Sequence, residues 1–575
     1  MDVLNPSHCR PIANGQLRQA LWCAFLCVVG AMHTVALGQV LPNAGTLLEE
    51  NKHFGRTNAP DTRPEVLEAP VRPTIKLPDG ATVSVAGFQI SGARSFASAE
   101  LMPLVAPWIG QTLDINGLNE AAGAITRFYQ GHGHFLSYAY LPAQKVEGGV
   151  IEIQVLEGRV DHVEVATASD VRLSDEVVQA HVGKVTESPT VLQPALERQL
   201  LLLNDIPGVV ARAAFTPSDV PGKADMVVSV AEEEPLGIRL DADNEGASST
   251  GQYRLGVDFQ FRDLFGVGDN TQARLIMSDT IDMVNGSVST RVPVTGRGLT
   301  LGGGISRLSY QLGGSFVSLG GVGTALVETV NLGVAAIRSL DRNLSFQFSV
   351  DHKGLDDQIV LTGADTPKRS NVLSGSVSYD QRDKWLGAGS LSAAMTLYHG
   401  RLTIGGTALA QDQAGLQTDG SFSKAGYDLW RLQSISGPIS VFVHVQGQYA
   451  RKNLDSSEKF DLGGPTAVRA YAVGEATLDD AQYASLELRA TKSYVGGTVV
   501  WSAFHDHGWG QFNVTPLAGG ASNRVVLYAN GVGVQWTRGN SFGVNASLAV
   551  RGPPLSILTG TDPRVRVYMQ VFQMY

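Results

Sequence analysis

The stretch Tyr253-Arg254-Leu255-Gly256-Val257-Asp258-Phe259-Gln260-Phe261-Arg262 places an apolar side chain at every second position. In an extended strand, successive side chains point to opposite faces, so this stretch has one apolar face and one largely polar face. Residues 236–243 show the same alternation, and Ala273, Leu275 and Met277 continue it. From about residue 236 to its end, the chain therefore reads as a succession of alternating strands.

Strands of this kind occur in two classes of protein. A soluble β-sandwich also alternates, but its apolar faces point inward. Here the segments are about ten residues long, lie between glycine-rich or polar turns and follow an export signal, which is the pattern of a transmembrane barrel. About 340 residues, at roughly twenty per strand and connection, predict an all-β barrel of about sixteen antiparallel strands over 235–575. A barrel of that size encloses a lumen wide enough for an extended chain.

The composition excludes several classes of function. The net charge of -10 and the pI of about 5.7 argue against nucleic acid as a partner. The low charged fraction of 17% and the 65 glycines fit many strands joined by turns. All three cysteines, Cys9, Cys23 and Cys27, lie within a predicted signal segment. A mature chain without that segment has no thiol for a disulfide, a zinc site or a nucleophile.

The N-terminal region reads as an export signal followed by a tether. In residues 1–38, Arg10 and Arg18 precede a short apolar run, and Ala36-Leu37-Gly38 offers small residues for cleavage. A transmembrane anchor is the alternative, but the run is short for one. Residues 39–58 contain a candidate short helix at 43–54. Residues 59–80 form a linker in which five prolines favour an extended spacer: Pro60, Pro64, Pro70, Pro73 and Pro78.

Between the linker and the barrel, two αβ modules of about 75 residues each are predicted. Residues 81–160 follow the order strand, helix, helix, strand, strand. Residues 161–234 repeat it loosely, with helices over 175–182 and 192–203 and strands near 209–215 and 226–230. These modules are too short for a cofactor fold, and we find no phosphate-binding loop in them, so we expect no cofactor.

Two motifs near the C-terminus carry chemically distinctive residues. Gly463-Gly464-Pro465 makes a tight turn, and Val468-Arg469-Ala470-Tyr471 follows it. About thirty-five residues later, Phe504-His505-Asp506-His507-Gly508 lies on a predicted strand, with Phe504, Asp506 and Gly508 on one face. An arginine at a turn tip can meet that carboxylate if the turn folds back. Local sequence alone favours a solvated arginine and an ordinary polar-face carboxylate, because isolated charged residues are mostly exposed.

Further motifs accompany this pair, in the order Leu141-Pro142-Ala143-Gln144, Leu156-Glu157-Gly158-Arg159, Asp243-Asn244-Glu245-Gly246, Thr250-Gly251-Gln252-Tyr253-Arg254 and Arg338-Ser339-Leu340-Asp341-Arg342-Asn343-Leu344. Each is weak alone, but with their order and spacing nearly the whole mature chain resembles the two-partner secretion transporters (TpsB family) of the POTRA-plus-barrel outer-membrane superfamily. The family has Val-Arg-Gly-Tyr where this chain has Val468-Arg469-Ala470-Tyr471. Because Ala470 replaces the glycine of the family, the backbone at the loop tip of this chain can differ from that of the family. The strand motif Phe-x-Asp-x-Gly is intact.

The resemblance implies a sixteen-stranded barrel in the outer membrane of a Gram-negative bacterium. Two POTRA domains, 81–160 and 161–234, would lie in the periplasm, and the helix within 39–58 would be able to plug the lumen. The loop with Val468, Arg469 and Tyr471 would fold into the barrel, where Arg469 would pair with Asp506. An arginine–carboxylate pair in a narrow lumen is geometrically specific. Because both ions lose water on pairing, the role expected for the pair is to fix the conformation of the loop.

The function implied is the export of a large secreted partner, which is an adhesin, a haemolysin or a contact-dependent toxin. The modules would bind the unfolded partner by adding a strand, and folding outside the cell would drive export. The chain would contact outer-membrane lipids and act as a monomer, without catalytic residues, metal or cofactor. Three alternatives stay open: a barrel-assembly factor, a passive porin and an outer-membrane enzyme. The histidines at 505 and 507 offer a metal pair. They share a face with Val499 and Trp501, which places them more simply near the membrane interface.

Overall fold

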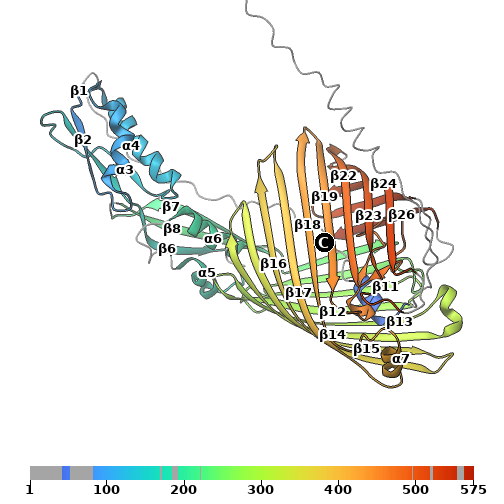
Figure 1. Cartoon of the computed structure of the whole chain (residues 1–575). Coiled ribbons are helices and arrows are strands. Elements are labelled where there is room, and N and C mark those ends of the chain that lie inside the picture. The colour runs from blue at the N-terminus through green and yellow to red at the C-terminus, as the bar shows by residue number, and fades with distance from the viewer. Residues whose placement is uncertain are drawn as a thin grey trace, which may run out of the picture.

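The computed structural model describes residues 42–51, 82–168, 171–183, 185, 192–220, 222–494, 496–517, 522–552 and 563–575. The signal segment predicted for 1–38 and the proline-rich linker predicted for 59–80 lie outside the described residues. Figure 1 shows a large barrel at the C-terminal end of the chain and two small modules beside one end of it.

Sixteen antiparallel strands close into one barrel, as the alternation predicts. They are β9 (Leu236–Asp243), β10 (Arg254–Arg262), β11 (Asn270–Ser278), β12 (Met283–Thr295), β13 (Leu299–Gln311), β14 (Gly321–Arg338), β15 (Arg342–Ile359), β16 (Ala364–Asp383), β17 (Gly389–Ile404), β18 (Gly420–Ser436), β19 (Ile439–Ala450), β22 (Asp480–Tyr494), β23 (Gly497–Gln511), β24 (Arg524–Arg538), β25 (Phe542–Arg551) and β26 (Val565–Met574). Each strand pairs with its neighbour in sequence, and β26 pairs back with β9.

The two faces of the wall have opposite character. Leu255 and Phe348 on the outer face are 50% and 51% exposed, whereas Arg254 and Asp241 on the inner face are buried. A soluble protein would hide the leucine and solvate the ions. In a bilayer the same arrangement is favourable, because apolar side chains face lipid and polar side chains face the lumen. The inverted faces therefore identify a transmembrane barrel.

The closing seam between β26 and β9 is short. It runs from the pair Gln570–Asp243 to the pair Met574–Arg239. Asn244 extends it beyond β9: its side-chain Nδ2 donates to the Val567 carbonyl at 2.9 Å, and its Oδ1 accepts from the Met569 N–H at 2.7 Å. The Asp243-Asn244 motif at the barrel entry therefore has a structural role at the seam.

The first module, residues 82–158, packs two helices on a small sheet. The order β2–β5–β4 contains one parallel pair, β2 with β5. Its elements are β1 (Val83–Ser84), β2 (Gly87–Ser91), α3 (Ser98–Val105), η1 (Ala106–Trp108), β3 (Thr112–Leu113), α4 (Ile115–Gly131), β4 (Tyr138–Tyr140) and β5 (Val150–Leu156). The first strand of the predicted order strand, helix, helix, strand, strand is instead split into β1 and β2. β3, between the helices, was not predicted.

The second module, residues 159–234, repeats this plan. Its sheet has the order β6–β8–β7, with helices α5 and α6 packed on it. The elements are β6 (Arg159–Thr167), α5 (Asp175–Val182), α6 (Gln193–Asn204), β7 (Val209–Pro217) and β8 (Lys223–Glu232). The predicted helix over 175–182 is α5, and the one predicted over 192–203 is α6 shifted by one residue.

Motifs of the first module are explained by its packing. The Glu157 carboxylate accepts the N–H groups of Arg94 and Ser95 at 2.8 and 2.6 Å and the Tyr129 hydroxyl at 3.0 Å. Burial opposes ionisation of Glu157, but these donors outweigh it and lower its pKa. The Gln144 amide likewise bonds both backbone groups of Glu152. These side chains fix loops of the domain.

The motif at residues 338–344 joins the second module to the barrel. The Arg338 guanidinium binds Asp205 of the module through Nε and Nη2, at 2.8 and 2.7 Å. The N–H of Leu340 donates to Glu197 at 2.9 Å. Arg172 of the same module donates to the carbonyl of Arg262, the last residue of β10, at 2.6 Å. The module is thus fastened to turns at one end of the barrel, which we call the module end.

A short helix, α2 (Ala44–Asn51), lies inside the barrel. Leu47 packs among inward-facing apolar side chains of the wall. Asn43 caps the helix by accepting from the N–H groups of Gly45 and Thr46. The sequence predicts this helix over 43–54, of which residues 52–54 are not described. In the part of the chain that the structure covers, no helix has the length and hydropathy needed to cross a bilayer.

Candidate functional site in the barrel lumen

The loop between β19 and β22 turns back into the barrel. Its base is a small hairpin in which β20 (Phe460–Asp461) pairs with β21 (Thr477–Leu478). The tip at 462–471 is closed by backbone bonds from Val468 N–H to the Leu462 carbonyl and from Gly464 N–H to the Tyr471 carbonyl. Gly464 has a φ of 107°, a conformation that favours glycine. We call residues 451–479 the lumen loop.

At the tip of the lumen loop, Arg469 reaches the wall. Its Nε and Nη2 lie 2.8 and 2.7 Å from the two oxygens of Asp506 on β23, and its own backbone N–H also donates to that carboxylate. The Asp506 side chain is fully buried and that of Arg469 is 13% exposed. The structure thus brings together the two charged residues of the sequence motifs, in a bidentate geometry rather than the solvated one.

The sequence reasoning did not find the partners that β22 contributes. Glu487 binds Arg469 Nη1 at 2.8 Å and also binds Arg489 at 2.7 Å. Ser485 and Tyr483 donate hydroxyl hydrogen bonds to Asp506 at 2.8 and 3.3 Å. The available signal was the polar alternation of β22, but without the pairing of β22 with β23 nothing connects it to Asp506.

The residues of the Phe-x-Asp-x-Gly strand motif have different structural roles. Phe504 lies under the Arg469 guanidinium, 3.4 Å from ring centroid to Cζ, and so adds a cation–π contact. A Cβ at Gly508 would lie 2.8 Å from side-chain atoms of both Leu462 and Val468. The absence of a side chain at 508 therefore lets the loop tip settle on the wall.

The apolar residues of the tip are buried between the loop and the wall. Val468 and Tyr471 join a core with Phe504 and with inward-facing residues of β22, β24 and β25. Burying such side chains stabilises the loop position by about 1.5–3 kcal/mol each. Ala470, which stands where the related family has glycine, is not among the described non-glycine residues with positive φ. Its backbone does not need glycine.

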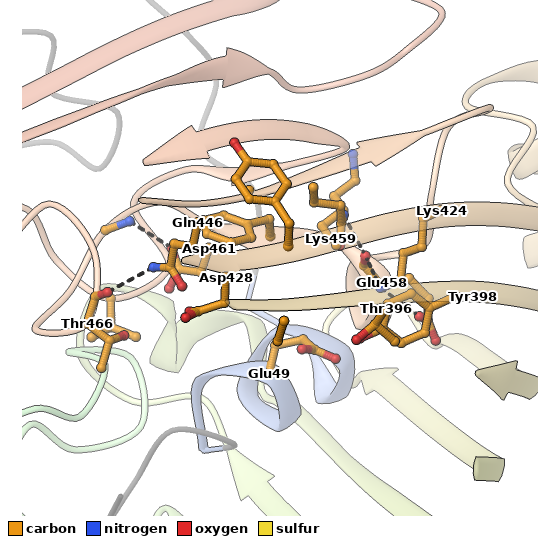
Figure 2. A pocket seen from close by; sticks show the side chains of 18 of the residues that line it. Glu49, Thr396, Tyr398, Lys424, Asp428, Gln446, Glu458, Lys459, Asp461 and Thr466 are labelled. Carbon is orange, nitrogen blue, oxygen red and sulfur yellow. Dashed lines mark hydrogen bonds and ion pairs between the residues drawn. The ribbon is translucent and has the colours of Figure 1, made fainter. Parts of the chain in front are cut away.

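The foot of the lumen loop is held by lysines of the wall. Lys353 and Lys424 bind Glu458 at 2.5 and 3.0 Å, and Lys368 binds Asp455 at 2.7 Å. A cavity of about 520 Å³ lies between this foot, the wall and α2. Figure 2 shows Glu49 of α2 among the side chains around the cavity.

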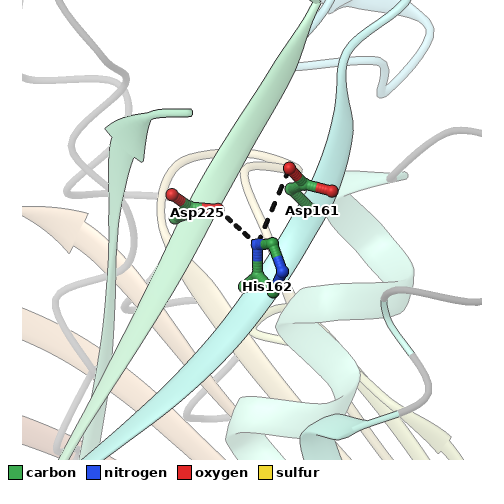
Figure 3. Close-up of side chains that lie close together, drawn as sticks. All are labelled: Asp161, His162 and Asp225. Atoms are coloured by element: carbon green, nitrogen blue, oxygen red, sulfur yellow. Dashed lines mark hydrogen bonds and ion pairs between the residues drawn. The ribbon is translucent and has the colours of Figure 1, made fainter. Parts of the chain in front are cut away.

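The histidines of the strand motif lie away from this site. His505 and His507 are half-buried and alternate with the buried Asp506. His505 pairs with Asn530 on the neighbouring strand. Among the described residues, the group that could hold a metal is instead Asp161, His162 and Asp225 of the second module, shown in Figure 3. There, one oxygen of Asp161 already binds Lys223 at 2.6 Å, so the lysine neutralises part of the negative charge of this group.

The arrangement holds the lumen loop against the wall. Arg469 is bound by two carboxylates, one ring and the Ser485 hydroxyl, which accepts from Nη2 at 3.1 Å, and all of these groups are on the wall. In a low-dielectric lumen such charge-assisted bonds are strong and directional. Removing one partner of a buried pair costs about 3–5 kcal/mol, because the other charge stays buried. The site is therefore a clamp between one loop tip and strands β22 and β23.

Comparisons with known proteins agree with this architecture. Residues 83–158 match the POTRA domain of ShlB type, and residues 222–534 match the haemolysin secretion/activation protein ShlB/FhaC/HecB. The heme/hemopexin transporter protein HuxB of Haemophilus influenzae strain 86-028NP is 26% identical over 465 residues, covering 78% of this chain and 80% of the relative. The outer membrane transporter CdiB of Escherichia coli strain 536 is 25% identical over 410 residues, 68% of this chain and 66% of the relative.

A solved structure shares the whole fold. CdiB from Escherichia coli superposes with a TM-score of 0.66 at 19% identity, covering 99% of this chain and 100% of that one. CdiB from Acinetobacter baumannii gives a TM-score of 0.58 at 16% identity, with coverages of 89% and 95%. At these identities the likeness shows the fold.

Proposed function

The chain belongs to the haemolysin secretion/activation family ShlB/FhaC/HecB, and we propose that it exports one dedicated partner protein to the cell surface. As a member of that family it is an outer-membrane transporter of the two-partner secretion class, and its POTRA region lies in the periplasm. The module end of the barrel is therefore the periplasmic end. The observation that carries the proposal is a barrel whose lumen holds a clamped loop and whose periplasmic end carries two αβ modules.

The chain is divided as follows in this proposal. A signal peptide at 1–38 is removed, and residues 39–58 hold the plug helix. The linker 59–80 tethers that helix to POTRA domains at 81–160 and 161–234, and the barrel occupies 235–575. The POTRA domains receive the unfolded partner by strand addition, and the partner leaves through the lumen.

The partner in this proposal is a large secreted protein, and the relatives are themselves named as transporters. HuxB is a heme/hemopexin transporter protein and CdiB an outer membrane transporter. We assign to this chain an adhesin, a haemolysin or a contact-dependent toxin as its cargo. It works as a monomer among outer-membrane lipids, without nucleic acid, cofactor or catalysis. The clamp formed by Val468, Arg469, Tyr471, Phe504, Asp506 and Gly508 fixes the lumen loop in the position that export requires.

Helix α2 closes the resting lumen in this mechanism. The N–H of Ala44 donates to Asp357 on β15 at 2.7 Å, and Ser456 of the lumen loop donates to Asn43 at 2.7 Å. Asp357 also accepts from the Tyr310 hydroxyl. A Cβ at Gly45 would lie 2.6 Å from Ser456 Oγ, so helix and loop are in close contact.

We expect Asp357→Ala to loosen this helix, because the first turn loses its charged acceptor. In planar bilayers the variant should show longer open times or larger conductance than the wild type. Asp356→Ala is the matched control, since that carboxylate lies next in sequence and is exposed. Equal conductance for wild type, Asp357→Ala and a deletion of residues 42–51 would contradict the plug.

The test of the function is deletion of the gene, followed by mass spectrometry of extracellular proteins and measurement of total outer-membrane barrels. We expect one large protein to disappear from the medium or cell surface while other barrels stay constant. A general fall in outer-membrane barrels would instead favour an assembly factor. No change in either would contradict a dedicated transporter and favour a porin.

A further inference from the structure

The loop tip is also held on the side away from Arg469. Arg551 is the last residue of β25, at the end of the barrel opposite the modules, and its side chain is 1% exposed. Its Nε donates to the Ala470 carbonyl at 2.9 Å. Its guanidinium lies 4.4 Å above the ring of Tyr471, and its Nη2 is 3.9 Å from Glu475. One arginine of the wall therefore contacts three residues of the lumen loop.

The next strand adds a second contact of the same kind. The Tyr568 hydroxyl on β26 donates to the Tyr471 carbonyl at 2.8 Å. The consecutive residues Arg469, Ala470 and Tyr471 are thus bound by β22 and β23 on one side and by β25 and β26 on the other. The tip spans the wall from β22 to β26, although it contributes only one charged side chain of its own.

We propose that Arg551 is a second positioning residue for the lumen loop, which works with Arg469 to hold the tip from the opposite side. This inference rests on the proposed function of the loop. The clamp on Arg469 holds its side chain and its backbone N–H against β22 and β23, whereas Arg551 and Tyr568 hold the carbonyls of Ala470 and Tyr471 against β25 and β26. A tip held at Arg469 alone would be anchored on one side only. A tip held from both sides has one position.

The chemistry of Arg551 supports positioning. Ala470 is fully buried, so its carbonyl would lose water without gaining a partner if Arg551 were absent. The guanidinium offers a planar face for Tyr471 and a fork of donors at the same time, which a lysine cannot reproduce. The rival interpretation is that Arg551 only stabilises the end of β25.

The two interpretations differ in whether the loop tip detaches from the wall when Arg551 is substituted. Val468 is fully buried between loop and wall, so a thiol introduced by Val468→Cys reports on detachment of the tip. The three native cysteines lie in the predicted signal segment, so this thiol would be the only one in the mature chain. Its modification by a membrane-impermeant maleimide would be followed in outer-membrane preparations, together with secretion of the protein whose export is lost on deletion of the gene.

In the Val468→Cys background, we expect Arg551→Met to raise the modification rate about ten-fold and to reduce secretion in parallel. Arg551→Lys should give a modification rate and a secretion level between those of Arg551→Met and the parent. Tyr568→Phe should raise the modification rate by about two- to three-fold. Arg524→Met is the matched control, because Arg524 is an exposed arginine at the same end of β24. It should change neither readout.

Arg551→Lys and Tyr568→Phe decide the question if Arg551→Met does not insert, since both keep the shape of the site. Wild-type modification rates in these variants, with a raised rate in Arg469→Ala, would overturn the role of Arg551 and leave the Arg469 clamp intact. Unchanged secretion in Arg469→Ala itself would overturn the proposed function of the loop, so the two failures are distinguishable.

Discussion

Secretion of the partner is expected to fall at least about ten-fold in an Arg469→Ala variant that still inserts at the wild-type level. The substitution leaves Asp506 fully buried without its bidentate partner, and Glu487 loses one of its two arginines. The loop tip then has no charged anchor on β22 and β23. Extracellular partner would be quantified per folded barrel, and single-channel conductance would be recorded in bilayers, where we expect larger or more variable currents.

Three further variants sharpen that experiment. Arg469→Lys keeps the charge but not the bidentate fork, so it should give an intermediate value. Gly508→Val reaches the same loop by crowding, because the new side chain would collide with Leu462 and Val468. Arg451→Ala removes an exposed arginine from the start of the same loop and serves as the control. Wild-type secretion and conductance in both Arg469→Ala and Gly508→Val would refute the clamp.

Deletion of residues 82–234 is expected to abolish secretion while the barrel remains in the outer membrane. The barrel closes through its own strand pairs, from β9 to β26, and its apolar outer face does not depend on the modules. In the proposed function, the modules supply the periplasmic strand edges to which an extended partner adds. Heat-modifiable migration in gels would establish that the truncated barrel is folded, and the partner should then accumulate in the periplasm or be degraded there.

Deletion of residues 82–234 also removes the contacts that Arg338 and Leu340 make with the second module. A single substitution therefore separates the attachment of the module to the barrel from the binding of the partner. Arg338→Ala breaks only the bidentate pair with Asp205 and keeps both modules. We expect it to secrete more than the deletion does. Normal secretion by the deletion itself would refute a role of the modules in receiving the partner.

Much of the fold could be predicted because apolar side chains recur at every second position along the strands. The stretch at residues 253–262 shows it, and the barrel follows from repetition of that pattern. The Arg469–Asp506 pair was accessible only through the resemblance to a family, since locally both residues look solvated. Glu487, Arg551 and Tyr568 could not be found, because their contacts depend on which strands stand opposite the loop. The two-residue alternation shows whether a side chain faces the lumen or the lipid, but it does not show which residues of the lumen loop that side chain contacts.

Strand length differs around the barrel in a way that concerns the surrounding lipid. β9 has 8 residues and β16 has 20. At about 3.3 Å per residue these are roughly 26 and 66 Å long before tilting. A spanning strand needs about 9–11 residues, so β9 falls just short of that length, its seam partner β26 meets it with 10 residues, and β16 far exceeds it. The wall is therefore lowest at the β26–β9 seam, and the hydrophobic match between wall and bilayer differs from one side of the transporter to the other.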